Sequence, residues 1–152
     1  MKVLKAMIAR AWRLPPAEWW LVVEAVAALA TARLVLAVLP FTQAMARLGL
    51  RPRVCPEGTP AFASDPAPTV HAVQRAMGRG RKLAPFRAVC LQQAVAASLM
   101  LRRRGVPVEV HFGVALDDIG ALRAHAWSVC LGTVITGGQT LAGHVRIAVF
   151  VP

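Results

Sequence analysis

The spacing of apolar and polar residues divides the chain into a helical first half and a strand-rich second half. Apolar residues at helical spacing, separated by lysines and arginines, predict a basic amphipathic helix over residues 1–13, which the Pro15-Pro16 pair ends. A longer apolar run predicts a second helix over residues 19–39, and residues 41–50 are typical of a short third one. These segments make up a predicted N-terminal helical region, residues 1–50.

The second of these helices is long enough to be considered as a membrane span. Glu24 and Arg33 interrupt it, so the segment has no continuous run of ~18 apolar residues. A charged side chain at the bilayer centre costs roughly 2.5 to 3.5 kcal/mol, and the prolines before the helix argue against a secretory signal. We therefore expect a helix that is buried or covered by a partner, in a cytoplasmic protein, with membrane association as the alternative.

A proline-rich stretch over residues 51–69 predicts a connector to the second half, residues 70–152. A further helix should begin at residue 68 or 69. It is expected to end at the sequence Gly78-Arg79-Gly80-Arg81-Lys82, which is typical of a solvated basic loop. The two halves are expected to form one compact unit.

The second half opens with a predicted helix that carries a cysteine in its first turn. Residues 89–104 are rich in alanine, leucine and glutamine, and Gly105 and Pro107 end the helix. Cys90 therefore lies beside backbone N–H groups that have no helical partner, at the positive end of the helix dipole. Both features favour a thiolate and can stabilise an oxyanion, so Cys90 is a candidate nucleophile. The alternative is a small buried apolar residue.

The remaining sequence alternates as half-buried strands do. Strands are predicted over residues 106–116, 122–131, 133–136 and 144–151. The expected architecture is α+β, with N-terminal helices followed by the Cys90 helix and an antiparallel meander. The second strand carries His125, and a sheet packed on the cysteine helix would bring this histidine close to Cys90 as a base.

Composition narrows the classes of protein to which the chain can belong. With 152 residues, of which 57% are hydrophobic, it can bury a real core. Its net charge of +11 should attract polyanions or an acidic partner, but does not determine the fold. The cysteines at positions 55, 90 and 130 form neither a disulfide framework nor a zinc signature, so we expect no metal site and a reducing cytoplasm.

Several short sequences together resemble a known family. They are similar to the maturation peptidase of lasso-peptide biosynthesis, a transglutaminase-like protein that removes the leader from the precursor. The resemblance covers roughly residues 75–140 and implies a transglutaminase-like or papain-like fold, with Cys90 as nucleophile, His125 as base and no cofactor. The sequences that carry it are Cys90-Leu91, Leu101-Arg102-Arg103-Arg104-Gly105-Val106-Pro107, Phe112-Gly113-Val114 and Ala124-His125-Ala126-Trp127.

The same resemblance implies partners. The substrate would be the leader of a precursor peptide, delivered by a separate leader-binding protein, and an ATP-dependent lasso cyclase would act next on the freed core peptide. No nucleotide site and no nucleic acid are expected for such an enzyme. The rival interpretation is a non-enzymatic basic module that binds an acidic peptide, nucleic acid or an anionic membrane through its charge.

The chain departs from the family's pattern at the third catalytic position. Transglutaminase-like enzymes carry a carboxylate on the strand after the histidine, which orients the imidazole, but no Asp or Glu follows Asp118 here. The orienting group would have to be Thr136, Gln139, a backbone carbonyl, or Asp117 or Asp118 folding back. Loss of an orienting group usually weakens an enzyme rather than abolishing its activity, and an inactive relative is the alternative.

Three more side chains are candidates for the cleft. Gln92 or Gln93 could donate an amide N–H to the oxyanion, or both could be solvated helix positions. Trp127 shares a face of its strand with His125, so it forms either a wall of the cleft or part of the core.

Overall fold

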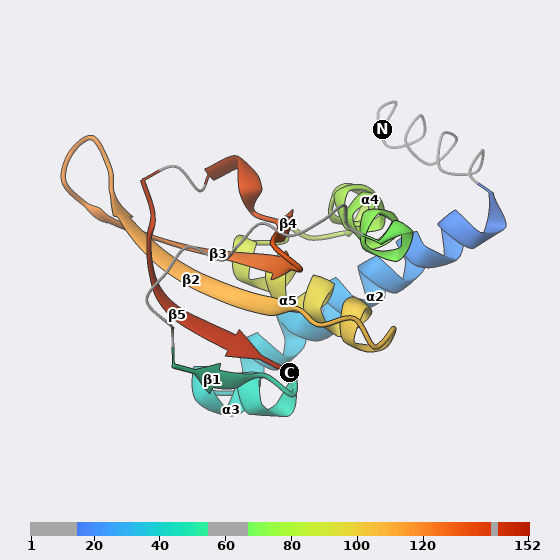
Figure 1. The fold of residues 1–152 in the computed structure, drawn as a ribbon, viewed down its shortest axis with the longest axis horizontal. Helices are drawn as coiled ribbons and strands as arrows, with labels where there is room; N and C mark the ends of the chain where they lie inside the picture. Colours follow the sequence, from blue (N-terminus) through green and yellow to red (C-terminus); the bar gives the residue numbers. More distant parts are fainter. Residues whose placement is uncertain (1–14, 55–66, 141–142) are drawn as a thin grey trace.

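The computed structural model describes residues 15–54, 67–140 and 143–152 (Figure 1). Within them, four helices and a five-stranded antiparallel sheet confirm the predicted α+β class. The expected helix over residues 1–13 lies outside the described residues. The helices are α2 (Pro16–Val38), α3 (Phe41–Arg47), α4 (Pro68–Leu83) and α5 (Cys90–Arg102), and the strands are β1 (Arg51–Arg53), β2 (Glu109–Leu116), β3 (Leu122–Cys130), β4 (Thr133–Thr136) and β5 (Val145–Val151), with a short 3-10 helix η1 (Gly138–Thr140) after β4.

The strand order, β1-β5-β2-β3-β4, corrects the predicted meander. β5 pairs with β2 rather than with β4, and there Phe150 meets Phe112 edge to face with ring centroids 5.4 Å apart. The outer side of β4 is approached instead by α4, whose Gln74 Nε2 donates to the Val134 carbonyl at 3.1 Å. The position of β5 beside β2 therefore involves a contact between aromatic residues that are far apart in the sequence. Local hydrophobic periodicity does not predict such a contact.

The predicted connector is wrong for its first three residues. Arg51–Arg53 forms β1, an edge strand paired antiparallel with β5 in the register Arg51 to Val151. Pro52 at its centre lacks an N–H donor, which an edge strand tolerates because one of its sides makes no ladder. Residues 55–66 of the connector lie outside the described residues.

The basic glycine-containing run is helical, not a loop. α4 continues through Gly78 and Gly80 to Leu83, because it is held against α2 along this stretch. A Cβ atom at Gly80 would lie 2.8 Å from the Ala25 Cβ, so the missing side chain lets the two helices approach closely. Tertiary packing here outweighs the poor helix propensity of glycine.

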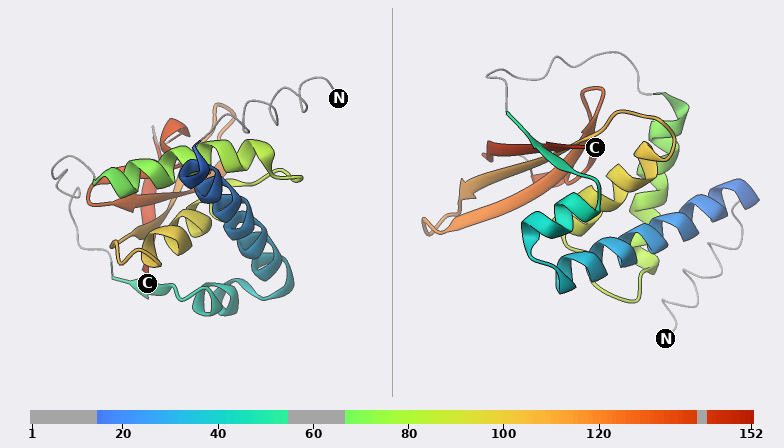
Figure 2. Two further views of the ribbon diagram at one scale, coloured as in Figure 1. Left: turned by 90° about the vertical axis from the view of Figure 1, so that its right-hand side faces the viewer. Right: turned by 90° about the horizontal axis from the view of Figure 1, so that it is seen from below.

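α5 occupies the middle of the molecule, between the sheet and α2, with α4 beside it (Figure 2). Its small side chains allow this close approach on several sides. The fully or nearly fully buried positions of α5 are Ala94, Val95, Ala96, Ala97, Ser98, Met100 and Leu101. At its far end, Arg104 Nη1 donates to Glu24 Oε1 of α2 at 3.0 Å, and this hydrogen bond lowers the pKa of Glu24.

α2 is buried along one face only. Val22, Ala25, Leu29 and Ala32 are buried in the core, whereas Trp20, Leu34 and Val38 are exposed on other sides of the helix. Among the described helices, α2 alone is long and apolar enough to cross a membrane, and 22% of its apolar stretch is buried inside the structure. The core helix of a soluble protein can have this same length and composition.

The two glycines of α4 provide a matched test of its packing. Gly80→Ala should lower the free energy of unfolding by ~1 to 2 kcal/mol, because the new methyl group overpacks the contact with Ala25. Gly78→Ala is the control, since nothing lies within 4 Å of a Cβ there. It should raise the free energy of unfolding by roughly 0.5 to 1 kcal/mol through helix propensity. Urea unfolding measures both, and equal effects of the two changes would contradict the packing role of Gly80.

Candidate functional site

Cys90 is the first residue of α5 and is half-buried. The residue before it, Val89, is extended and has no side-chain acceptor that could cap the helix. The first backbone hydrogen bond of the helix runs from the Gln93 N–H to the Val89 carbonyl at 3.1 Å. The N–H groups of residues 90–92 therefore have no partner within the helix, as at any helix start. These donors lie in the same first turn as Cys90 and are suited to bind a carbonyl oxygen.

His125 lies on β3, at the end of its pairing with β4. β4 pairs with β3 only from Ser128 to Cys130, so His125 lies beyond this pairing. Its ring stacks on Trp127, with centroids 6.1 Å apart and planes inclined by 20°. Trp127 is 7% exposed, so it belongs to the core and supports the imidazole from below rather than forming a wall of the cleft.

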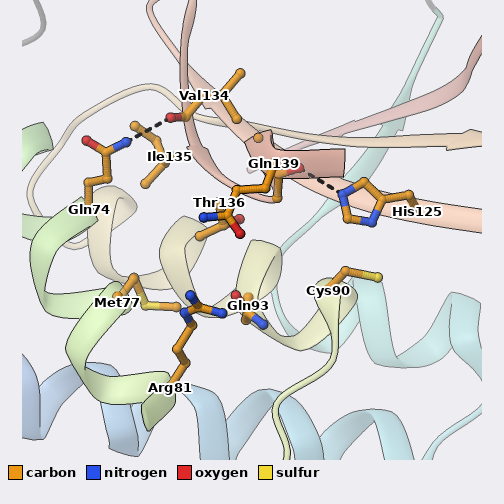
Figure 3. A pocket seen from close by; sticks show the side chains of 13 residues that line it. Gln74, Met77, Arg81, Cys90, Gln93, His125, Val134, Ile135, Thr136 and Gln139 are labelled. Atoms are coloured by element: carbon orange, nitrogen blue, oxygen red, sulfur yellow. Dashed lines mark hydrogen bonds between the residues drawn. The ribbon is translucent and has the colours of Figure 1, made fainter. Parts of the chain in front are cut away.

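A cavity of about 440 Å³ brings Cys90 and His125 together (Figure 3). It lies between α4, the start of α5 and the end of β4, and we call it the first cavity. The candidates Gln93, Thr136 and Gln139 line it as well. The complete lining consists of Gln74, Met77, Gly78, Arg81, Cys90, Gln93, His125, Val134, Ile135, Thr136, Gly137, Gly138 and Gln139.

A backbone carbonyl orients the histidine. His125 Nε2 lies 2.9 Å from the Gly137 carbonyl oxygen, and because a carbonyl only accepts, Nε2 carries the proton. The other ring nitrogen, Nδ1, is then the one without a proton, and it lies on the side of the ring nearer to Cys90 in Figure 3. A backbone carbonyl is one of the orienting groups that the sequence allows, and the carbonyl that contacts His125 is that of Gly137.

Gly137 also explains why no carboxylate side chain occupies this position. It has a φ of 79°, which disfavours residues with a side chain. A Cβ atom would lie 2.9 Å from His125 Nε2, from the Ala126 carbonyl oxygen and from the Trp127 Cβ. The backbone itself fills the space next to the imidazole, so a side chain at position 137 would displace the ring it should orient.

Of the other candidates for the orienting role, Thr136 and Gln139 line the first cavity with His125, whereas Asp117 and Asp118 do not. Thr136 is buried, and its Oγ1 lies 2.9 Å from Ser128 Oγ. Asp117 is at the β2–β3 hairpin, where it accepts from the Ala121 N–H at 2.8 Å and from Arg123 Nε at 2.8 Å. These bonds lower the pKa of Asp117, the Ala121 bond most. Asp118 is exposed in the same turn, and the hairpin carries both carboxylates away from the first cavity (Figure 1).

The two glutamines differ in what they bind. Gln92 Oε1 accepts from the Val89 N–H at 3.2 Å, so this side chain stabilises the helix start and does not line the first cavity. Gln93 Nε2 donates to the Ala88 carbonyl at 2.8 Å and does line it. An amide nitrogen carries two protons, so Gln93 Nε2 has a second N–H that can donate a hydrogen bond to a substrate.

Two features of the site were missed by sequence reasoning. The ring of His144 lies next to that of His125, with centroids 5.3 Å apart, although His125 is on β3 and His144 directly precedes β5, which does not pair with β3. The carbonyl of Gly137 was also not identified, although its position twelve residues after His125 coincides with the slot expected for a carboxylate. No sequence signal distinguishes a useful carbonyl from any other.

The other cysteine that the structure describes, Cys130, belongs to the core. Cys130 is buried in the core, and burial raises the pKa of its thiol. Cys55 lies outside the described residues. Over residues 15–54, 67–140 and 143–152, the structure has no group of three or more metal-ligating side chains of the kinds His, Cys, Asp and Glu.

Comparison with known proteins agrees with this geometry. Residues 21–149 match the family model described as the transglutaminase-like superfamily, a span that includes Cys90, His125 and Gly137. Comparisons with curated proteins and with solved structures gave no match. On the strength of the family match, which extends from α2 into β5, this chain belongs to the transglutaminase-like superfamily.

Proposed function

We propose that this protein is a cysteine peptidase that removes the leader from a ribosomally made lasso-peptide precursor. The observation that carries the proposal is the first cavity, where a cysteine at a helix N-terminus meets a histidine with a defined tautomer. Membership in the superfamily supports a Cys/His chemistry. The choice of a lasso precursor rests on the resemblance of residues 75–140.

The site supports a mechanism in four steps. His125 Nδ1 accepts the thiol proton of Cys90, and the thiolate sulfur attacks the scissile carbonyl of the leader. The oxyanion that forms accepts hydrogen bonds from the N–H groups at the start of α5. The protonated His125 then gives its Nδ1 proton to the departing amine, which leaves an acyl-enzyme. A water molecule, deprotonated by the same nitrogen, hydrolyses the thioester and restores Cys90.

A neutral orienting group has a cost for this mechanism. The Gly137 carbonyl fixes the tautomer and the ring direction, but a dipole stabilises an imidazolium less than a carboxylate would. We therefore propose an active enzyme with weakened support for its ion pair, in preference to an inactive relative. The intact contact from His125 Nε2 to Gly137 favours the active form.

The partners remain part of the proposal. A separate leader-binding protein would deliver the precursor, and the ATP-dependent cyclase would consume the freed core peptide. No cofactor is needed for thiol peptidase chemistry. We place the protein in the cytoplasm, where the precursor is made and where thiols stay reduced, with the exposed side chains of α2 as the feature that would allow membrane association.

Alkylation rates test the assignment of Cys90. At neutral pH, Cys90 should react with iodoacetamide roughly tenfold or more faster than Cys130, because the latter is buried and has a raised pKa. The reaction of Cys130 should increase only as the pH rises above the range of an ordinary thiol. Mass spectrometry of peptides from the folded protein gives both rates. Equal rates would contradict a reactive Cys90.

Removal of either catalytic side chain tests the mechanism itself. Cys90→Ala and His125→Ala should each reduce leader cleavage by about 10³-fold or more in the system reconstituted with the leader-binding protein. Cys130→Ala is the matched control and should leave the rate within a few-fold of the original. If cleavage survives His125→Ala undiminished, the base is assigned wrongly, and the basic binding module becomes the better interpretation.

Neighbouring glycines test the orienting carbonyl. Gly137→Ala should reduce kcat by roughly 10 to 100-fold, which corresponds to ~1.4 to 2.7 kcal/mol, because the new methyl group displaces the His125 ring. Gly138→Ala is the control, since its Cβ would meet only Val134, at 3.3 Å and beyond. Thermal unfolding shows whether each variant remains folded. Full activity of a folded Gly137→Ala protein would exclude the orienting role.

A further inference from the structure

Two arginines lie beside Cys90. Arg81, on α4, lines the first cavity, and Figure 3 shows its guanidinium group pointing into this cavity. A second cavity, of about 550 Å³, also borders Cys90 and is lined by Arg81 and Arg87. Cys90, Gln93 and Arg81 line both cavities, so a peptide held at Cys90 passes Arg81 and can reach Arg87.

Four of the five carboxylates that the structure describes form ion pairs elsewhere. Glu18 pairs with Arg75 and Arg79, Glu24 with Arg103 and Arg104, Glu109 with Arg53, and Asp117 with Arg123. Within the described part of the chain, none of them pairs with Arg81 or Arg87, and neither cavity is lined by an Asp or Glu. Among the described residues, therefore, no carboxylate neutralises Arg81 or Arg87, and their charge can attract an anionic ligand.

We propose that Arg81 and Arg87 select a peptide with an acidic side chain close to its scissile bond. A guanidinium group binds a carboxylate through two parallel hydrogen bonds, which gives direction as well as charge. The glutamines that line the first cavity, Gln74, Gln93 and Gln139, are neutral and cannot discriminate by charge. This inference rests on the proposed peptidase function and adds the substrate class to it.

Paired alkylating reagents test the charge preference without any peptide. With iodoacetate and iodoacetamide alike, the Cys90 thiolate sulfur forms a bond to the CH₂ carbon and iodide departs into solvent, and the two reagents differ chiefly in one negative charge. The quantity to measure is the rate of Cys90 with iodoacetate divided by its rate with iodoacetamide, normalised to the same quotient for N-acetylcysteine. We expect this ratio to fall roughly two- to fivefold in Arg81→Gln and to a smaller extent in Arg87→Gln. High salt should also lower this ratio for the unmodified protein, because it screens the charge of the arginines.

Arg47→Gln is the matched control, because it removes the same charge from α3, at an exposed position that lines neither cavity. Its ratio should equal that of the unmodified protein. If Arg81→Gln and Arg87→Gln also leave the ratio unchanged, the two arginines do not select anions at Cys90, and the inference is overturned.

A second arm uses precursors that carry either Glu or Gln at residues flanking the scissile bond. The unmodified enzyme should have the higher kcat/KM for the Glu form, and Arg81→Gln should lose this preference. Equal cleavage of both forms by the unmodified enzyme would overturn the selectivity while leaving the peptidase function intact. If no precursor is cleaved, the proposed function fails, and the reagent ratio alone still decides whether Cys90 favours anions.

Discussion

The structure depends on the burial of α5 on several sides at once. Ala94 and Val95 lie in one core cluster with Val110 and Ala126 of the sheet, and Ala96, Ala97 and Met100 lie in a second cluster that includes residues of α2 and α4. Side chains as small as alanine are needed for this, because larger ones would force the layers apart. A helix held in this way cannot shift along its axis without breaking contacts on several faces. Its first turn, and with it Cys90, is therefore fixed relative to the end of β4.

The same constraint explains how the site manages without a carboxylate. The chain leaves β4 at Thr136, whose hydroxyl is tied to Ser128, and turns at once through the positive φ of Gly137. This turn directs the Gly137 carbonyl at His125, and the stacked Trp127 keeps the ring in the plane where the bond is made. Orientation thus comes from backbone geometry and packing. What the backbone cannot supply is a full negative charge, so tautomer control and electrostatic support, which a carboxylate provides together, are separated here.

The parts of the fold that the sequence predicts are those determined by neighbours along the chain. The start of the cysteine helix, the strands around His125 and the strand at Thr133–Thr136 follow from helix signals and alternation, and the structure confirms them. The errors concern distant contacts. The run from Gly78 to Lys82 has loop composition but is held as a helix by Ala25 of α2, and Arg51–Arg53 became a strand only through its pairing with β5. The candidate site divides in the same way, since Cys90 and His125 have identifiable chemistry, whereas a carbonyl acquires its role only from the fold.

The structure shows that part of the excess positive charge lies beside Cys90. Net charge alone indicates attraction to an acidic partner of any kind. In the structure, the paired carboxylates join separate elements: Glu18 connects α2 with α4, Glu24 connects α2 with the end of α5, and Glu109 connects β2 with β1. In the part of the chain that the structure describes, no acidic side chain lines the two cavities beside Cys90, whereas Arg81 lines both and Arg87 lines one. In the peptidase that we propose, a positive field over the Cys90 thiolate would favour both the attacking anion and the oxyanion that follows, and an acidic substrate residue would partly neutralise this field when it binds. The proposed chemistry of Cys90 is thus linked to the basic composition of the chain, because the carboxylates that pair in the described structure join its elements away from this site.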